Sequence, residues 1–330
     1  MSIKYELLTR DNISKESLAS ICKLANLIYK ENEFSIDYIK WRFFQTPFPI
    51  NFNIAAHLNG QTLIGHASLA PRLLYLNGKN VWAAQSIASI VNPNYQRKGT
   101  YTEMAKLIYK SATDWGIEFI WGFPNSNSHY GRKAKLNWSD IYEIPTKTLL
   151  SKNISNFSKL SINTDSQNNL DLIEIKNIPL GKFDDIRKRV SSVFFVRNNQ
   201  YYHWRYVKNP RYKYYLYTVG HNIDGYMIIK YYRMHNGLYI DVVEIEATDL
   251  NNFEKLILVI ISKIKEESLL GANIWINTNH PFAPLLEKYR FQNTIPITYF
   301  SYFKMDKLKK FSFISDFRKW YVSMGDSDIY

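Results

Sequence analysis

The spacing of apolar residues changes along the chain, and each spacing predicts a type of element. Recurrence every three or four residues predicts an amphipathic helix, whereas alternation and short apolar runs predict strands. The first half therefore begins with two helices, continues with a meander of three strands, and ends with a helix, a strand and a short helix. The expected ranges are 15–32 and 35–46 for the first helices, 53–58, 62–74 and 81–91 for the strands, 100–115 for the next helix, 117–123 for the fourth strand and 128–136 for the last helix.

A basic turn with one glycine, Gln-Arg-Lys-Gly at 96–99, joins the third strand to the helix that follows. Thr100 and Glu103 have the spacing of a capping box at the start of this helix. Free N–H groups at a helix start, the helix dipole and the two cations of the turn together suit a pyrophosphate. Gly99 has no Cβ to obstruct the approach of a phosphate. The sequence therefore predicts an anion site at this turn.

The chain contains a faint internal repeat. Trp41-Arg42-Phe43 matches Trp204-Arg205-Tyr206 at an offset of 204 − 41 = 163 residues. The landmarks around and after this match keep their order in the second half, including an Asn-Gly pair that signals a hairpin turn. Repetition of this kind predicts two copies of one fold. The further matched pairs are Tyr38 with Tyr201, Pro47 with Pro210, Gly65 with Gly225, Asn77-Gly78 with Asn236-Gly237, and Asn125 with Asn279.

The length of 330 residues suits two domains of about 150 residues each. We expect an N-terminal domain at 1–150, a linker region rich in Ser and Asn at 151–180, and a C-terminal domain at 181–330. Hydrophobic residues at 46% and charged residues at 22% are typical of a globular chain. The single cysteine, Cys22, excludes an internal disulfide, and the seven scattered histidines do not have metal-ligand spacing, so we expect no metal site.

The net charge of +13 favours anionic partners such as phosphate-bearing metabolites. Lysines are spread along the chain rather than clustered, which argues against a nucleic-acid surface. The sequence has neither a run of about 18 apolar residues nor a leader-like start. We therefore expect a cytoplasmic protein that does not insert into membranes, and a homo-oligomer is compatible with the composition.

Residues 91–138 resemble the central motif of the GNAT superfamily of acyl-CoA-dependent N-acyltransferases. Gln96 and Gly99 match the family signature Gln/Arg-x-x-Gly-x-Gly/Ala, with Tyr101 where glycine or alanine is usual. A strand, a turn, a helix, a second strand and Asn125 follow one another in the family's order. The resemblance implies an α/β (α+β) fold of two tandem GNAT-like domains, each a central mixed, mostly antiparallel sheet flanked by helices.

The same resemblance implies a site for acyl-CoA as cosubstrate. The pantetheine arm would bind the edge of the third strand and contact Asn125, and backbone amides of the turn would bind the pyrophosphate. Tyr130 would protonate the departing thiolate, because a phenol of pKa about 10 can protonate a thiolate whose thiol has a pKa of about 8.5. The implied donor-site residues are Ser89, Ile90, Val91, Gln96, Arg97, Lys98, Gly99, Thr100, Tyr101 and Asn125.

The second half lacks the glycine turn, since "LYIDVVEIEATD" runs directly into the next predicted helix. We therefore expect this half to build the acceptor pocket without binding CoA. Two such copies, with their Trp-Arg elements and the C-terminal "WYVSMGDSDIY", resemble bacterial tandem-GNAT sugar N-acyltransferases. That resemblance implies a nucleotide-linked amino sugar as acceptor, of the dTDP-3-amino-3,6-dideoxyhexose type, which receives an acetyl or 3-hydroxybutanoyl group for surface polysaccharide.

Direct attack of an amine on the thioester requires a group that takes the amine proton. A histidine beside Asn125 and several carboxylates of the second half could do this, or could be solvated or ion-paired groups. Arg42 and Arg205 could each hold a chain end in place or contact a phosphate. The candidate proton acceptors are His129, Asp241, Glu244, Asp326 and Asp328.

Two other functions remain open at this level. A tRNA-dependent aminoacyl transferase also uses tandem GNAT-like halves and is often basic, but it would not need the CoA turn and commonly carries a helical arm that the sequence does not indicate. A non-catalytic module that binds CoA or a nucleotide is the third possibility.

Overall fold

The computed structural model of the chain describes residues 2–29, 34–154, 170–173, 182–220, 222–305 and 313–328, and every structural statement below concerns these residues. Its elements bear out the helices and strands that the apolar spacing predicts, within a few residues of their expected ends. The last residues of the first predicted helix, 30–32, lie outside the described residues.

The first half has the predicted order with one additional strand at each end. The strands at residues 3–8 and 138–150 were not predicted from the apolar spacing. The elements are β1 (Ile3–Leu8), α1 (Lys15–Tyr29), α2 (Ile36–Phe43), β2 (Phe52–Leu58), β3 (Thr62–Leu76), β4 (Lys79–Val91), α3 (Thr100–Trp115), β5 (Phe119–Gly122), α4 (Ser126–Leu136) and β6 (Trp138–Leu150).

The second half repeats this order, with β8 as an additional strand between its first two helices. Most of the predicted linker region at 151–180 lies outside the described residues, and the part of it at 170–173 is a strand. The elements are β7 (Leu170–Ile173), α5 (Lys182–Val190), β8 (Val193–Phe195), α6 (Asn199–Tyr202) with a π-helical turn at His203–Val207, β9 (Tyr215–Val219), β10 (Gly225–Met234), β11 (Gly237–Ala247), α7 (Leu250–Glu266), β12 (Gly271–Ile274), α8 (Ala283–Lys288) and β13 (Gln292–Phe303).

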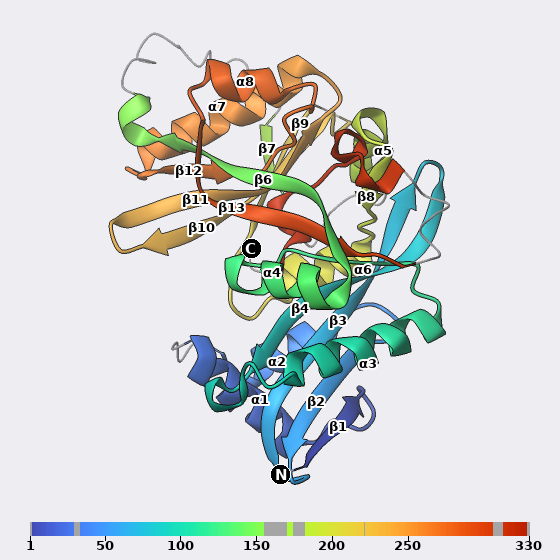
Figure 1. Cartoon of the computed structure of the whole chain (residues 1–330). Coiled ribbons are helices and arrows are strands. Elements are labelled where there is room, and N and C mark those ends of the chain that lie inside the picture. The colour runs from blue at the N-terminus through green and yellow to red at the C-terminus, as the bar shows by residue number, and fades with distance from the viewer. Residues whose placement is uncertain are drawn as a thin grey trace.

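One mixed sheet runs through both halves (Figure 1). Its strand order is β1-β2-β3-β4-β5-β13-β6-β12-β11-β10-β9-β7, and β8 pairs with β3 outside this path. The parallel pairs are β4 with β5 and β11 with β12, one in each half at equivalent places. The prediction of two copies of one fold, each a mostly antiparallel mixed sheet with flanking helices, is thereby confirmed.

The final strand of each half is exchanged with the other half. In the first half β6 pairs with β12, and in the second half β13 pairs with β5. The two exchanged strands also pair with each other along most of their length. The sheet is therefore continuous between the halves, and each half completes the edge of the other half's parallel pair.

One hairpin differs from the sequence prediction by a residue. The first-half turn is Asn77-Gly78 as predicted, with both residues at positive φ. In the second half Met234 pairs directly with Gly237, so the two turn residues are His235 and Asn236. The predicted Asn236-Gly237 turn is corrected accordingly.

Helices cover both faces of the first-half sheet. Helix α3 packs on β2, β3 and β4, with Met104 and Ile108 buried against Ile54 and Ile64. Helices α1 and α2 pack on the opposite face, where Ile87 of β4 joins their core. None of the described helices has the length and apolar character needed to cross a membrane.

Candidate active site

A wedge opens between β4 and β5. The two strands pair in parallel at three positions, of which Gln85 with Trp121 is the last. Strand β4 continues for 91 − 85 = 6 residues beyond that point, so its edge from Ser86 to Val91 is free of β5. Unpaired N–H and C=O groups of a strand edge can bind an extended ligand as if it were another strand.

A β-bulge bends β4 within this wedge. On the other edge of β4, Ile87 pairs with Ser68 and Ile90 pairs with His66, so Ala88 and Ser89 together face one residue of β3. Ala88 has a φ of 39°, in the left-handed region that non-glycine residues seldom adopt. Such a bulge re-aims the strand and leaves a residue outside the regular ladder. Backbone strain of this kind is concentrated at functional sites.

The basic turn after β4 has the geometry of an anion-binding nest. Arg97 has a φ of 62° and Gly99 a φ of 84°, so left-handed residues alternate with ordinary ones. The described residues provide no hydrogen-bond acceptor for the backbone N–H groups of residues 97–102. Gln96 closes the turn by donating from Nε2 to the Val91 carbonyl at 3.0 Å. Several free donors thus converge at the start of α3, where the helix dipole is positive.

The predicted capping box at Thr100 and Glu103 is wrong. The N-cap residue is Gly99, no side chain caps the helix, and Thr100 is already its first helical residue. The Glu103 N–H donates to the Gly99 carbonyl, and the Glu103 carboxylate pairs with Lys106 instead. Because no side-chain oxygen occupies the helix start, its N–H groups stay available to an anion.

Buried polar groups without hydrogen-bond partners gather beside the wedge. Arg132 of α4 is 5% exposed, and its Nε and Nη1 have no partner among the described residues. The Tyr109 hydroxyl faces Ser86 and Tyr101 without the geometry of a hydrogen bond. Burying a polar group unpaired costs free energy, so such a set suits a polar ligand that enters the wedge. The unpartnered atoms include Thr100 Oγ1, Tyr101 Oη, Tyr109 Oη, Arg132 Nε, Arg132 Nη1 and Trp138 Nε1.

The predicted residues of α4 lie at the start of that helix. The Asn125 side chain is the N-cap and accepts from the Ser128 N–H at 3.0 Å. His129 Nε2 lies 2.7 Å from Asp140 Oδ1, and its ring stacks on Tyr299. Tyr130, the predicted acid, is 78% exposed. Its role in protonating the thiolate stays a prediction.

The carboxylates predicted as proton acceptors all lie in ion pairs. Asp241 faces Lys230, with Asp241 Oδ2 3.4 Å from Lys230 Nζ. Burial raises the pKa of Asp241 against the opposing effects of Lys230 and Asn273. Asp328 pairs with Arg42 and has a side chain 18% exposed, against 3% for Asp241. Asp328 is thus the more accessible of these two carboxylates.

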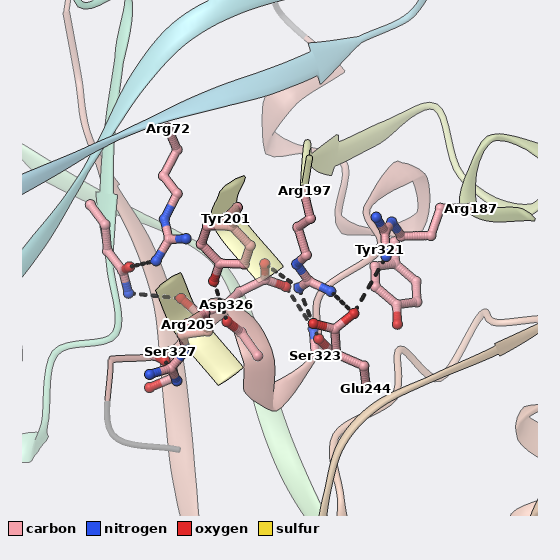
Figure 2. Close-up of polar contacts among 12 residues, drawn as sticks. Arg72, Arg187, Arg197, Tyr201, Arg205, Glu244, Tyr321, Ser323, Asp326 and Ser327 are labelled. Atoms are coloured by element: carbon pink, nitrogen blue, oxygen red, sulfur yellow. Dashed lines mark hydrogen bonds and ion pairs between the residues drawn. The ribbon is translucent and has the colours of Figure 1, made fainter. Parts of the chain in front are cut away.

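A buried network holds the segment 323–328 between the two halves (Figure 2). Arg197 lies 2.5 Å from both Glu244 Oε2 and Asp326 Oδ1. Burial alone would lower the pKa of this guanidinium, but Asp326 and Glu244 raise it well above its ordinary value, so it stays charged. Both carboxylates are 2% exposed or less. Their ion pairs with Arg197 give them a structural role in this network, as the alternative to accepting a proton.

The same segment contacts β4 at the deep end of the wedge. Gln85 of the last β4–β5 pair donates from Nε2 to the Asp326 carbonyl at 2.8 Å. Arg205 donates to the Ser327 carbonyl at 2.9 Å, and Arg42 pairs with Asp328. Two roles were considered for these repeated arginines, holding a chain end and contacting a phosphate. In the structure both Arg42 and Arg205 hold the segment 323–328.

The helix of the second half that corresponds to α3 has a closed N-terminus. Asp249 is the N-cap of α7 and accepts from the Asn252 N–H at 2.8 Å. The side-chain carboxylate therefore occupies the position that an anion would take at α3. This agrees with the expectation that the second half does not bind CoA, which stays a prediction.

Sequence reasoning missed some of the buried groups of the wedge. Arg132 and Tyr109 were not singled out, because a lone arginine or an aromatic residue in an amphipathic helix gives no signal of its own. Asn137 did carry a signal, since it stands where the family has glycine. Its φ of 55° shows that the position is left-handed, a conformation that asparagine tolerates at a helix end.

Comparison with known proteins gives a family match within the first half. Residues 12–134 match the family model described as "Acetyltransferase (GNAT) domain". No curated protein matches the chain in sequence. This family match covers the free edge of β4, the basic turn and most of α4.

Solved structures match most of the chain at low sequence identity, which shows a shared fold. A GCN5-related N-acetyltransferase from Anabaena variabilis has a TM-score of 0.67 and 14% identity, over 91% of this chain and 72% of that one. A probable N-acyltransferase from Enterococcus faecalis has a TM-score of 0.65 and 11% identity, over 93% and 74%. Saccharomyces cerevisiae N-myristoyltransferase, solved with bound myristoyl-CoA, has a TM-score of 0.61 and 12% identity, over 92% and 79%.

Proposed function

Residues 12–134 match the GNAT acetyltransferase domain, and we propose that the chain is an N-acyltransferase of that superfamily that acylates the amine of a nucleotide-linked amino sugar. The acyl group is acetyl or 3-hydroxybutanoyl, carried by coenzyme A. The sugar is of the dTDP-3-amino-3,6-dideoxyhexose type, used for surface polysaccharide. The net charge of +13 supports an acceptor that carries a diphosphate.

The single observation that carries the donor side is the open start of α3. The free N–H groups of residues 97–102 suit the pyrophosphate of CoA, and Arg97 and Lys98 add positive charge. The pantetheine arm extends from there along the free edge of β4, toward Ser86. The five residue-to-residue steps of strand from Val91 to Ser86 span roughly 17 Å, which is of the order of an extended pantetheine arm.

The transfer is a direct attack of the neutral amine on the thioester carbonyl. A backbone amide of the free β4 edge donates to the oxygen that becomes negative, which stabilises the transition state. The carbon–nitrogen bond forms, the carbon–sulfur bond breaks, and the sulfur leaves as a thiolate. This mechanism needs no covalent intermediate with the protein.

Asp328 is our choice for the carboxylate that takes the amine proton. It lies two residues after Asp326, whose carbonyl contacts Gln85 at the deep end of the wedge. Its side chain is 18% exposed, whereas Asp241, Glu244 and Asp326 are 3% exposed or less and are held in buried ion pairs. An acceptor can therefore reach Asp328 with less rearrangement than the other three carboxylates would need.

A mass-spectrometric assay tests the proposal directly. Purified protein is incubated with a panel of acyl-CoAs, from acetyl to long chains, and with dTDP- and UDP-linked amino sugars. We expect one of the sugar nucleotides to gain the mass of the acyl group when it is paired with the right acyl-CoA. If no sugar nucleotide gains mass with any donor while CoA binds, the sugar acceptor is wrong.

Matched glycine variants test the donor site. Gly99→Glu places a carboxylate where the pyrophosphate is proposed to bind and should abolish CoA binding measured by calorimetry. Gly60→Glu is the control, because Gly60 also has a positive φ of 74° and open space around it, in the β2–β3 turn. Equal CoA affinity of both variants would contradict the donor site, and RNA bound to the purified protein would favour the tRNA-dependent transferase.

A further inference from the structure

Arg132 holds a buried charge at the deep end of the wedge. Its guanidinium lies over the Trp138 ring, 4.5 Å from the centroid, and no described carboxylate forms an ion pair with it. Its Nε and Nη1 are buried and have no hydrogen-bond partner among the described residues. A cation removed from water in this way is costly unless something negative or polar meets it.

The guanidinium of Arg132 lies close to a glycine. A Cβ on Gly122 would lie 3.0 Å from Arg132 Nη1 and 3.0 Å from the Ser86 carbonyl oxygen. Gly122 and Ser86 directly follow the last β4–β5 pair, at Gln85 and Trp121. The guanidinium therefore lies where the two strands separate, at the end of the path that starts at the basic turn.

We propose that Arg132 binds the sulfur of coenzyme A and stabilises it as the thiolate leaving group. The inference rests on the proposed function, because it needs the pantetheine arm to enter the wedge. When the amine nitrogen bonds to the carbonyl carbon, the carbon–sulfur electron pair moves onto sulfur. The N–H groups of Arg132 donate to that sulfur while the charge develops, and the amine proton leaves to a base.

The groups that face Arg132 do not neutralise its charge. Tyr109 of α3 faces it as a neutral phenol, since burial raises the Tyr109 pKa above its ordinary value, and Tyr101 is beside Tyr109. Asp140 on β6 is engaged by His129, Lys133 and Ser301. Arg132 is therefore an unneutralised cation, unlike Arg42 or Arg197.

The test is the thiol pKa of bound CoA, read from the ultraviolet absorbance of the thiolate. An opposite charge at contact distance lowers an acid's pKa by about 1–3 units. We expect CoA bound to the wild-type protein to titrate about 1–3 units lower than CoA bound to Arg132→Met. Arg132→Lys keeps the charge and should give an intermediate value.

Two controls separate this role from a structural one. Lys135→Met removes a charge from the exposed part of the same helix and should leave the thiol pKa unchanged. Desulfo-CoA lacks the sulfur, so wild type and Arg132→Met should bind it with equal affinity if the variant is folded. Above the thiol pKa, CoA itself should bind more weakly to Arg132→Met, about tenfold for each unit of pKa shift.

The outcomes distinguish a failure of the role proposed for Arg132 from a failure of the proposed donor site. If CoA binds stoichiometrically to both proteins and its thiol titrates equally, the role of Arg132 is overturned and the donor site stands. If CoA does not bind to the wild-type protein, the donor site and the role of Arg132 are both overturned.

Discussion

Trp41 and Trp204 form a reciprocal contact across the two halves of the chain. Nε1 of Trp41 donates to the Trp204 carbonyl at 3.0 Å, and Nε1 of Trp204 donates to the Trp41 carbonyl at 3.2 Å. Their rings stack with centroids 5.0 Å apart. The repeat seen in the sequence is therefore a symmetric pair in space, and each copy satisfies the other's buried polar groups.

Removing either indole N–H should destabilise the protein by a similar amount. Trp41→Phe and Trp204→Phe each keep a stacked ring but leave a buried carbonyl unpaired, which costs about 1–3 kcal/mol. Denaturant unfolding of both variants measures this. Trp115→Phe is the control. Because Trp115 is 39% exposed, this substitution should lower the free energy of unfolding by less. A loss confined to one member of the pair would contradict the symmetry.

A side chain at Gly325 should destabilise the protein. A Cβ there would lie 2.6 Å from the Tyr206 hydroxyl and 3.0 Å from Glu244, inside the buried network. We expect Gly325→Ala to lower the free energy of unfolding by about 1–3 kcal/mol. Gly131→Ala has open space in α4 and should be neutral or stabilising. Thermal unfolding of the two variants compares them, and equal melting temperatures would argue against tight packing of the segment 323–328.

Removing the α7 cap should cost stability without creating a second donor site. Asp249→Ala should lower the free energy of unfolding by about 0.5–2 kcal/mol, because the N–H groups of the first turn lose their acceptor. Calorimetry should give one CoA per chain in both wild type and variant. Two molecules per chain in the wild type would show that the second half binds CoA after all.

His66 should make the protein less stable in mild acid. It is fully buried, and neither ring nitrogen has a partner among the described residues; burial, with a smaller effect from Arg42, lowers its pKa to about 3. The unfolded chain binds a proton to this histidine near its ordinary pKa of about 6.5, whereas the folded chain does not. Stability contributed by neutral His66 is therefore lost as the pH falls from about 6.5 toward 3.

The magnitude follows from the two pKa values. Between pH 7 and pH 5 this single group should remove about 2 kcal/mol of unfolding free energy. His66→Gln should reduce that pH dependence, and the control His235→Gln, at an exposed turn, should keep it. Denaturant unfolding at the two pH values measures both. An unchanged slope in His66→Gln would show that His66 is not the group responsible.

The site could be predicted only in part. Gly99 and Gln96, whose role in CoA binding stays a prediction, were singled out because a strand, a turn and a helix adjacent in sequence place the turn amides together, whatever the rest of the chain does. The capping-box prediction was wrong because of the backbone conformation of Gly99. The spacing of Thr100 and Glu103 is compatible with a cap, but the left-handed Gly99 moves the helix start by one residue.

The sequence alone determined what local periodicity and repetition specify: the predicted helices and strands, the two copies and the glycine turn between β4 and α3. Tertiary structure decided the exchange of β6 and β13, the position of the segment 323–328 and the burial of Arg132. Those features depend on contacts between residues far apart in the chain, such as Gln85 with Asp326. No local pattern encodes such a contact, because its free energy arises only when both halves are folded against each other.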